Sequence, residues 1–417
     1  MKQTEIRVFL FHFFYLIEIR FLLSQGSEIV MDVAKFNKSP AGKVKKTPQN
    51  YWAFVPNSLP PPVVYTPALV ALLSEADRAL GALEGMGKIL PNADLLVMPY
   101  MRREAVLSSR IEGTQASLSD LFLFEAAKTE PPESSDVREV SNYVSAMRHG
   151  LKRLPELPLS KRLVREIHEK LMRGVRGQEQ TPGEFRNRQN WVGPKNCRLE
   201  DAVYVPPPVD EVDTLLDDWE KFAHKQAQMP PLIQCAILHS QFESIHPFLD
   251  GNGRVGRLLI TLFLCERGHL SQPLLYLSGY LERNRSAYYE CLQQVREVGD
   301  WIGWIEFFLH AVSQQSSDAI ECANRILKLK EAYRSRLQKK WSSAAILTLL
   351  DGLFLNPYVT VGNAAERMGV SYNAAQNALD KLAVLKIVKE ITGQKRNRIY
   401  CAQELLRVIE SADSKKD

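Results

Sequence analysis

The sequence predicts a mainly α-helical protein with one β-hairpin and a C-terminal winged helix-turn-helix domain. Apolar residues recur at helical spacing along most of the chain, which indicates helices packed on common cores. Two short apolar stretches on either side of a polar turn, within 189–205, predict the hairpin. Three short helical segments followed by two β-stretches, within 344–400, predict the winged helix.

Length and composition are typical of a soluble protein with several domains. Its 417 residues suffice for roughly two to four domains with sizeable cores. A hydrophobic content of 45% and a charged content of 24% are ordinary for globular proteins, and a net charge of +5 does not by itself indicate a nucleic-acid partner. The six cysteines form no CxxC pair, so they indicate neither a zinc site nor a disulfide framework, and we expect the cytoplasm as compartment.

The first thirty residues allow two interpretations. Residues 8–24 are strongly apolar beside a basic N-terminus, as in a signal peptide or a membrane anchor. However, Glu18 and Arg20 interrupt this run and no small-residue cleavage site follows. We therefore favour Met31 as the start of the protein, with no membrane association, and expect residues 32–50 to be a flexible lead-in.

Four regions follow from these patterns, with a polar, proline-containing linker at 128–136. They are an extension over 1–50, an N-terminal helical region over 51–127, a central helical domain over 137–335 and the winged helix over 341–417.

The N-terminal region contains a helix over 100–113 that ends at Glu112 and Gly113. A glycine directly after the last periodic residue is a common helix terminator. On this pattern alone, Glu112 is a surface carboxylate at the end of a helix.

Residues 246–257 have the composition of a phosphate-handling site. An apolar helix beginning near Asn252 leaves unpaired N–H groups and a positive dipole at its start, which favours an anion. Gly251 and Gly253 have no Cβ, so the backbone can turn and approach a phosphate closely. Arg254 and Arg257 are three residues apart on one helix face and offer forked donors to phosphate oxygens.

Two more residues of this stretch suggest catalysis. His246 has an ordinary pKa near 6.5 and can take a proton at neutral pH, as in general base catalysis. Asp250 would repel an anion so close by unless a hard cation such as Mg²⁺ lies between them. The simpler interpretation is a helix-capping turn beside a buried histidine, but it leaves the coincidence of so many requirements unexplained.

The stretch resembles the Fic family signature HPFx(D/E)GNGRxxR and matches it at every position. The resemblance implies a helical catalytic core over 137–335 with a hairpin flap, and transfer of AMP from ATP to a protein hydroxyl with Mg²⁺. It implies His246 as the base and Asp250 as the metal ligand. The phosphates would be bound by the remaining residues of the motif: Gly251, Asn252, Gly253, Arg254 and Arg257.

A second Fic-like motif lies upstream. Many Fic proteins have an inhibitory helix with the motif (S/T)xxxE(G/N), which Ser108, Glu112 and Gly113 match. The resemblance implies that Glu112 pairs with Arg257 and takes the place of the ATP γ-phosphate. The site would then be restrained until the helix is displaced.

Downstream of the motif, Asn284 can either cap a helix or meet an adenine edge. By resemblance to the nucleobase-contacting part of the family, we predict that it contacts ATP. In the winged helix, the helix over 371–383 and the basic turn over 393–397 could contact DNA, although such domains also bind proteins or form dimers.

The sequence thus predicts a protein adenylyltransferase that Glu112 inhibits and that uses ATP, Mg²⁺ and an unidentified target protein. Self-modification and a homodimer remain open. Two alternatives also remain: removal of AMP or another nucleotidyl or phosphoryl transfer on the same scaffold, and a DNA-binding regulator whose Fic domain senses a ligand.

Overall fold

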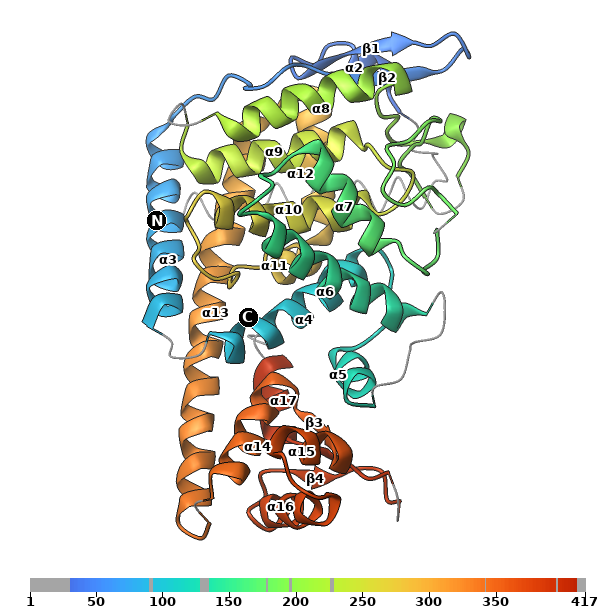
Figure 1. Ribbon diagram of the computed structural model, residues 1–417. Coiled ribbons are helices and arrows are strands. Elements are labelled where there is room, and N and C mark those ends of the chain that lie inside the picture. Colours follow the sequence, from blue (N-terminus) through green and yellow to red (C-terminus); the bar gives the residue numbers. More distant parts are fainter. Residues whose placement is uncertain are drawn as a thin grey trace, which may run out of the picture.

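The computed structural model describes residues 31–89, 93–127, 135–177, 179–194, 197–225, 229–341, 343–394 and 397–410. It is mainly helical, as the sequence predicts (Figure 1). The apolar stretch 8–24 and most of the linker, 128–134, lie outside these residues. Within the part that is described, no helix is long and apolar enough to cross a membrane.

Eleven helices make up most of the chain between residues 67 and 338. They are α3 (Pro67–Ile89), α4 (Asp94–Ile111), α5 (Leu118–Ala127), α6 (Asp136–Arg153), α7 (Lys161–Leu171), α8 (Val209–His224), α9 (Pro231–Ile245), α10 (Asn252–Glu266), α11 (Ser278–Arg283), α12 (Arg285–Val298) and α13 (Trp301–Gln338). The predicted helix 100–113 begins earlier, at Asp94, and contains Pro99. Burial of Leu95, Leu96 and Val97 before the proline offsets its helix-breaking tendency.

Helix α9 is the buried axis of the central core. Every residue from Leu232 to Ile245 is buried, so α9 is enclosed on all faces, its polar side chains included. Two buried tryptophans donate to its carbonyl groups: Trp219 Nε1 to Leu238 at 2.9 Å and Trp304 Nε1 to Ala236 at 2.8 Å. Because α8 and α13 hold α9 in this way, the position of its C-terminal end, and hence of His246, is fixed.

Residues 31–56 are ordered, so the expectation of a flexible lead-in is wrong. They form α2 (Val33–Phe36) and an antiparallel pair, β1 (Gly42–Lys46) and β2 (Trp52–Pro56). The cause is a small apolar cluster in which the rings of Phe36 and Phe54 lie 5.3 Å apart and both approach Tyr204. This cluster attaches the N-terminal sheet to the segment that was predicted as a hairpin.

That predicted hairpin, 189–205, is only a single antiparallel bridge in the described residues. Val192 N donates to the Tyr204 carbonyl at 2.8 Å, and Val203 N donates to the Val192 carbonyl at 2.9 Å. The chain does not extend this ladder because its polar groups bond elsewhere: Val205 accepts from Phe54 N of β2 at 2.9 Å. Residues 195 and 196, at the turn, lie outside the described part.

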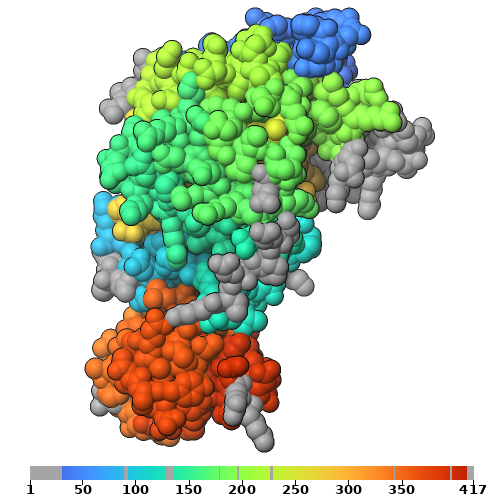
Figure 2. Space-filling model, turned by 45° about the vertical axis from the view of Figure 1, so that its right-hand side comes forward, coloured from blue at the N-terminus to red at the C-terminus, as the bar shows by residue number. Residues whose placement is uncertain are grey.

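The C-terminal unit forms a separate lobe (Figure 2). It contains α14 (Ala344–Leu355), β3 (Tyr358–Thr360), α15 (Val361–Met368), α16 (Tyr372–Val384), β4 (Lys389–Glu390), β5 (Ile399–Cys401) and α17 (Gln403–Glu410), with strand order β3-β5-β4. Thr360 and Ser371 accept from first-turn N–H groups of α15 and α16, and Gly369 turns the chain between them at φ 64°. Two residues of the predicted basic turn, Lys395 and Arg396, lie outside the described residues.

We expect Phe54→Ala to detach the N-terminal sheet. Truncating a buried phenylalanine costs about 3–5 kcal/mol where the site cannot collapse, and Phe54 is 1% exposed. Amide hydrogen exchange of β1 and β2 should therefore become much faster. Trp52→Ala, on the same strand but 40% exposed, is the control and should change little. Equal protection of β1 and β2 in both variants would contradict the packing account.

Candidate active site

The active-site loop begins where α9 ends. His246 adopts a left-handed conformation, φ 49° and ψ 59°, that costs a non-glycine residue roughly 1–2 kcal/mol. Its carbonyl oxygen accepts hydrogen bonds from Arg186 Nε and Asn190 Nδ2, both at 3.0 Å. These two donors, from the segment before the Val192 bridge, hold the strained backbone in place.

Asn252 closes the loop from the other side. Its Oδ1 accepts from Phe248 N and its Nδ2 donates to the Phe248 carbonyl, both at 2.8 Å. The Phe248 ring is buried and stacks on His168 at 3.7 Å. The side-chain amide of Asn252 is therefore used by the loop, which leaves its backbone N–H, at the start of α10, for the predicted phosphate contact.

Both glycines of the stretch are needed for close approach. Gly251 has φ 79°, and a Cβ there would lie 2.9 Å from Met172 Sδ. As the N-cap of α10 it provides no side-chain acceptor for the first-turn N–H groups. A Cβ at Gly253 would collide with Glu112 Oε1 and lie 2.9 Å from Arg257 Nη1. Glycine at 253 thus lets Glu112 reach the beginning of α10.

The structure places Glu112 against Arg257. Arg257 Nη2 lies 2.7 Å from Glu112 Oε1 and also donates to the Ser108 carbonyl at 2.9 Å, while Nε donates to Ser108 Oγ at 2.9 Å. The Arg257 side chain is 1% exposed but that of Glu112 is 35% exposed. The guanidinium is therefore fixed inside the core, whereas the carboxylate is accessible and sits after the last residue of α4, just before Gly113 at φ 96°.

The charges of this pair stabilise each other. Burial is the largest influence on the Glu112 carboxyl and by itself raises its pKa, but the charge and hydrogen bond of Arg257 outweigh it, so the pKa lies below 4.5. Burial likewise acts to lower the pKa of Arg257, and Glu112 outweighs it in the opposite direction. Both groups are therefore ionised at neutral pH.

Arg254 has unused donors. Its side chain is 5% exposed, with Nη1 3.5 Å from Glu139 Oε2 and Nη2 3.7 Å from Asp250 Oδ1. Both distances are those of ion pairs and exceed that of a good hydrogen bond, and Nε and Nη1 have no hydrogen-bond partner among the described residues. Buried donors without partners are rare, so this side chain is suited to an anion.

His246 is positioned as a neutral imidazole. Burial, followed by the nearby positive charges of Arg296 and Arg186, lowers its pKa to about 3. Its Nδ1 lies 3.4 Å from the Glu243 carbonyl oxygen and 4.0 Å from Glu243 Oε2. A proton on Nδ1 would face these oxygens and leave the Nε2 lone pair available to take a proton from a substrate.

Asp250 is the most exposed of the predicted site residues on this loop. Its side chain is 44% exposed, and Oδ1 accepts from Gly251 N at 2.6 Å. Across the described residues, no three His, Cys, Asp or Glu side chains gather in a metal-binding group. One carboxylate fits Mg²⁺ only if substrate phosphates supply further ligands, which is a common arrangement for this ion.

Family comparison agrees with this geometry. The model for the Fic/DOC family N-terminal region matches residues 70–152, which include Ser108 and Glu112. The Fic/DOC family model matches residues 158–264, which include the whole loop and α10. The chain belongs to the Fic/DOC family.

Relatives of this Fic protein are similar over part of their length. A "Probable protein adenylyltransferase" of Aquifex aeolicus is 34% identical over 115 residues, 26% of this chain and 33% of the relative. "Protein adenylyltransferase Fic" of Aedes aegypti is 30% identical over 190 residues, 45% of this chain and 32% of the relative. The chain thus spans about a third of the length of these two curated relatives.

Similarity of fold extends further. The crystal structure of a Fic family protein from Desulfovibrio desulfuricans G20 superposes with a TM-score of 0.54 and 20% identity. The match covers 82% of this chain and 98% of that one. At this identity the likeness concerns the fold alone.

Asn284 is the one predicted site residue that follows α10 in the chain. It sits between α11 and α12, where Nδ2 donates to the Tyr280 carbonyl at 2.9 Å instead of capping α12. Among the hydrogen bonds of the described residues, none joins its side chain to the loop. The nearby Tyr288 is buried and bonds His239 at 2.9 Å, which makes His239 a core residue, whereas Tyr289 is 42% exposed.

Sequence reasoning missed five residues that build the Fic loop: Arg186, Asn190, Glu139, Glu243 and Thr114. Arg186 lies just before the predicted hairpin and Asn190 within it, and no sequence pattern marks either as a clamp on a backbone about 60 residues away. Thr114 Oγ1 donates to Glu139 Oε2 at 2.8 Å, so the turn after Glu112 is attached to the carboxylate that faces Arg254. No local pattern signals that contact, because it joins segments 25 residues apart.

We expect Glu112→Gln to destabilise the protein in a pH-dependent way. Removing the carboxylate leaves Arg257 without its anion and should cost about 1–3 kcal/mol, the typical range for a hydrogen bond to a charged group. Because the folded-state pKa of Glu112 lies below 4.5, the difference is fully present above that pH and is lost as pH falls through the folded-state pKa.

Urea denaturation at a series of pH values measures this difference. The control is Glu200→Gln, whose carboxylate is 71% exposed and should contribute little at any pH. A difference between wild type and Glu112→Gln that stays constant down to pH 3 would contradict the pairing.

Proposed function

We propose that this Fic protein transfers AMP from ATP to a hydroxyl group of a protein, and that Glu112 restrains the reaction. The observation that supports this most is the contact between Glu112 and the buried Arg257, one helical turn from the unpartnered donors of Arg254 and near the neutral His246. The relatives named protein adenylyltransferase point to this chemistry.

In this proposal His246 takes the proton from the attacking hydroxyl. The hydroxyl oxygen forms a bond to the α-phosphorus of ATP, and the bond between that phosphorus and the bridging oxygen of pyrophosphate breaks. A neutral imidazole is ready to accept the proton at neutral pH. General base catalysis typically contributes about 10²–10⁴-fold to the rate.

Phosphates would lie at the beginning of α10. Gly251 leaves the first-turn N–H groups without a side-chain acceptor, and Arg254 adds its unpartnered donors. Arg257 would bind the γ-phosphate when Glu112 is withdrawn. Asp250, exposed at the same edge, would hold Mg²⁺ together with the phosphates. When bound, that ion would neutralise the charge that develops on the phosphates.

Glu112 and the γ-phosphate would compete for Arg257. With Glu112 in place, ATP could bind only with its triphosphate displaced from the orientation needed for attack. A displacement of about 1 Å can slow a reaction roughly 100-fold. The exposed Glu112 can leave, whereas the buried Arg257 cannot, so movement of α4 would control the site.

The target segment would bind beside residues 189–205, as an extended strand over the site. Residues 189–205 are held at one end by the bond from Phe54 N of β2 to the Val205 carbonyl. At the other end Asn190 Nδ2 donates to the His246 carbonyl of the loop. We also propose that the C-terminal unit is a winged helix, because it contains the three helices α14, α15 and α16 and a small sheet of order β3-β5-β4, with β3 between α14 and α15 and the other two strands after α16. Tyr372, Asn373 and Asn377 are exposed on α16 and could therefore reach DNA. DNA binding by this unit stays a prediction.

Incubation with ATP and Mg²⁺ tests the proposed function. With α-labelled ATP, Glu112→Gly should label itself or a lysate protein about 10- to 100-fold more than the wild type, because the γ-phosphate gains Arg257. Adding His246→Ala to that variant should lower labelling at least ~100-fold.

A parallel reaction with γ-labelled ATP distinguishes AMP transfer from phosphoryl transfer. AMP transfer leaves the protein without γ-label, whereas phosphoryl transfer labels it. If Glu112→Gly transfers no α-label to any protein, or if His246→Ala changes nothing, the proposed activity is wrong.

A further inference from the structure

Glu112 lies at the tip of a helical hairpin. Helix α4 leads up to it and α5 begins six residues later, at Leu118. The two helices are joined by Arg102, whose Nη2 lies 2.8 Å from Glu125 Oε2 and whose guanidinium lies over the Phe122 ring at 5.5 Å. We call residues 94–127 the α4–α5 hairpin. Because Arg102 joins its two helices, displacement of one helix affects the other.

The C-terminal unit contacts this hairpin, and several of these contacts lie on α5, away from the tip that carries Glu112. Asn363 Nδ2 donates to the Ala126 carbonyl at 2.6 Å, a group in the last turn of α5 that has no partner within its own helix. Asn356 Nδ2 donates to the Phe122 carbonyl at 3.0 Å, and Ser119 Oγ donates to Glu410 Oε1 at 3.3 Å. Helices α14 and α17 also pack against α4.

The same unit is attached to the catalytic core through α13. This long helix packs along α3 and continues to the C-terminal unit (Figure 1). There Tyr333 bonds Glu404 at 3.2 Å, and Arg325 Nη2 donates to the Val408 carbonyl at 2.9 Å. The unit therefore connects α13, which is fixed in the core, to the hairpin that presents Glu112.

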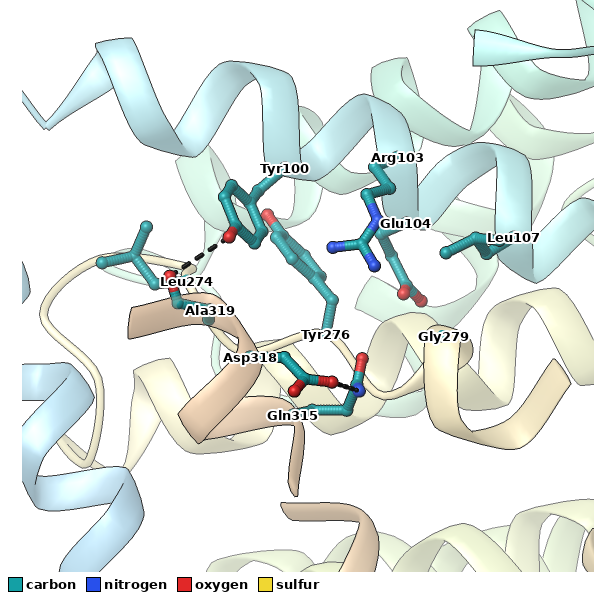
Figure 3. Close-up of a pocket in the computed structure, with 10 residues that line it drawn as sticks. All are labelled: Tyr100, Arg103, Glu104, Leu107, Leu274, Tyr276, Gly279, Gln315, Asp318 and Ala319. Atoms are coloured by element: carbon teal, nitrogen blue, oxygen red, sulfur yellow. Dashed lines mark hydrogen bonds between the residues drawn. The ribbon is translucent and has the colours of Figure 1, made fainter. Parts of the chain in front are cut away.

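The middle of α4 approaches α13 at Tyr100, which donates to the Ala319 carbonyl at 3.1 Å. Beside this contact lies a small pocket with a volume of about 10 Å³, enough for roughly one water molecule (Figure 3). On α4 the lining continues to Leu107, the residue before Ser108, and on α13 it includes Gln315 and Asp318. Nearly all of α4 is buried, so displacing Glu112, which follows its last residue, requires the α4–α5 hairpin to move as a whole.

We propose that the C-terminal unit is a brace that keeps Glu112 on Arg257 by holding the α4–α5 hairpin. The role of Glu112 in restraint rests on the proposed function, but the mechanical connection does not. Loosening the contact between the unit and the hairpin lets the hairpin move as a whole and frees Arg257 for a phosphate. A partner that pulls the unit from the hairpin would start the reaction without touching the active site.

The test uses the full chain with Asn356→Ala and Asn363→Ala combined. Two hydrogen bonds are lost, and since each contributes a few-fold to tenfold in an equilibrium, the freed state should become about 10- to 100-fold more populated. Hydrogen exchange of residues 108–117 should speed up by that factor, while α9 and α10 keep their protection. Asn373→Ala, an exposed asparagine of α16, is the matched control and should leave exchange unchanged.

The single variant Asn363→Ala is the control for folding. Asn356 also accepts from Tyr358 N at 2.8 Å, a bond within the C-terminal unit that Asn356→Ala removes and Asn363→Ala leaves intact. The single variant should give a smaller change in the same direction. α-Labelling from ATP should rise in the double variant and should not rise further when Glu112→Gly is added, because both changes free the same residue.

The readouts separate the two proposals. Faster exchange at 108–117 without labelling in any variant supports the brace and overturns the transferase function. Strong labelling by Glu112→Gly, with unchanged exchange and labelling in the two asparagine variants, overturns the brace and leaves the function standing. Unchanged exchange in both asparagine variants overturns the brace whatever the labelling shows.

Discussion

A buried guanidinium needs an anion beside it, and in this protein that requirement concerns Arg257. Its side chain is 1% exposed, so an uncompensated charge there would be strongly destabilising. Ser108 fills part of its hydrogen-bonding capacity from α4, and Glu112 supplies the negative charge. The position of α4 against α10 depends on this contact and, under the proposed function, so does the state of the catalytic site.

The surrounding structure fixes one partner of the contact and leaves the other accessible. Helix α10 lies in the core beside the fully buried α9, so Arg257 and His246 have set positions. Glu112 instead follows the last residue of α4, is one third exposed and precedes a glycine. Under the proposed function the hairpin controls the site. The hairpin is held by α6 through Thr114, by α11 through Glu104, by α13 through Tyr100 and by the C-terminal unit through Asn363.

Local patterns predicted the helical class and the residues that this account depends on. Residues 246–257 indicate a loop followed by the beginning of a helix, and Ser108 to Gly113 indicate the end of a helix. Each of these signals lies within one short segment, so the sequence alone can reveal it. The clamp on His246 could not be predicted, since Arg186 and Asn190 reach it across about 60 residues. The order of residues 33–56 depends on a cluster with Tyr204, which composition cannot show. The predicted hairpin is reduced to one bridge, between Val192 and Tyr204, because the next carbonyl, that of Val205, accepts from Phe54 N of β2.

Equilibrium binding of ATP and ADP measures whether Glu112 and the γ-phosphate compete for Arg257. Calorimetric titration of the wild type and of Glu112→Gly with each nucleotide compares the contribution of the γ-phosphate in the two proteins. With competition, the wild type should bind ATP no more tightly than ADP, and the variant should gain about tenfold or more for ATP alone, since the charge of Arg257 becomes available to the γ-phosphate. An equal ratio of ATP to ADP affinity in both proteins would contradict this competition.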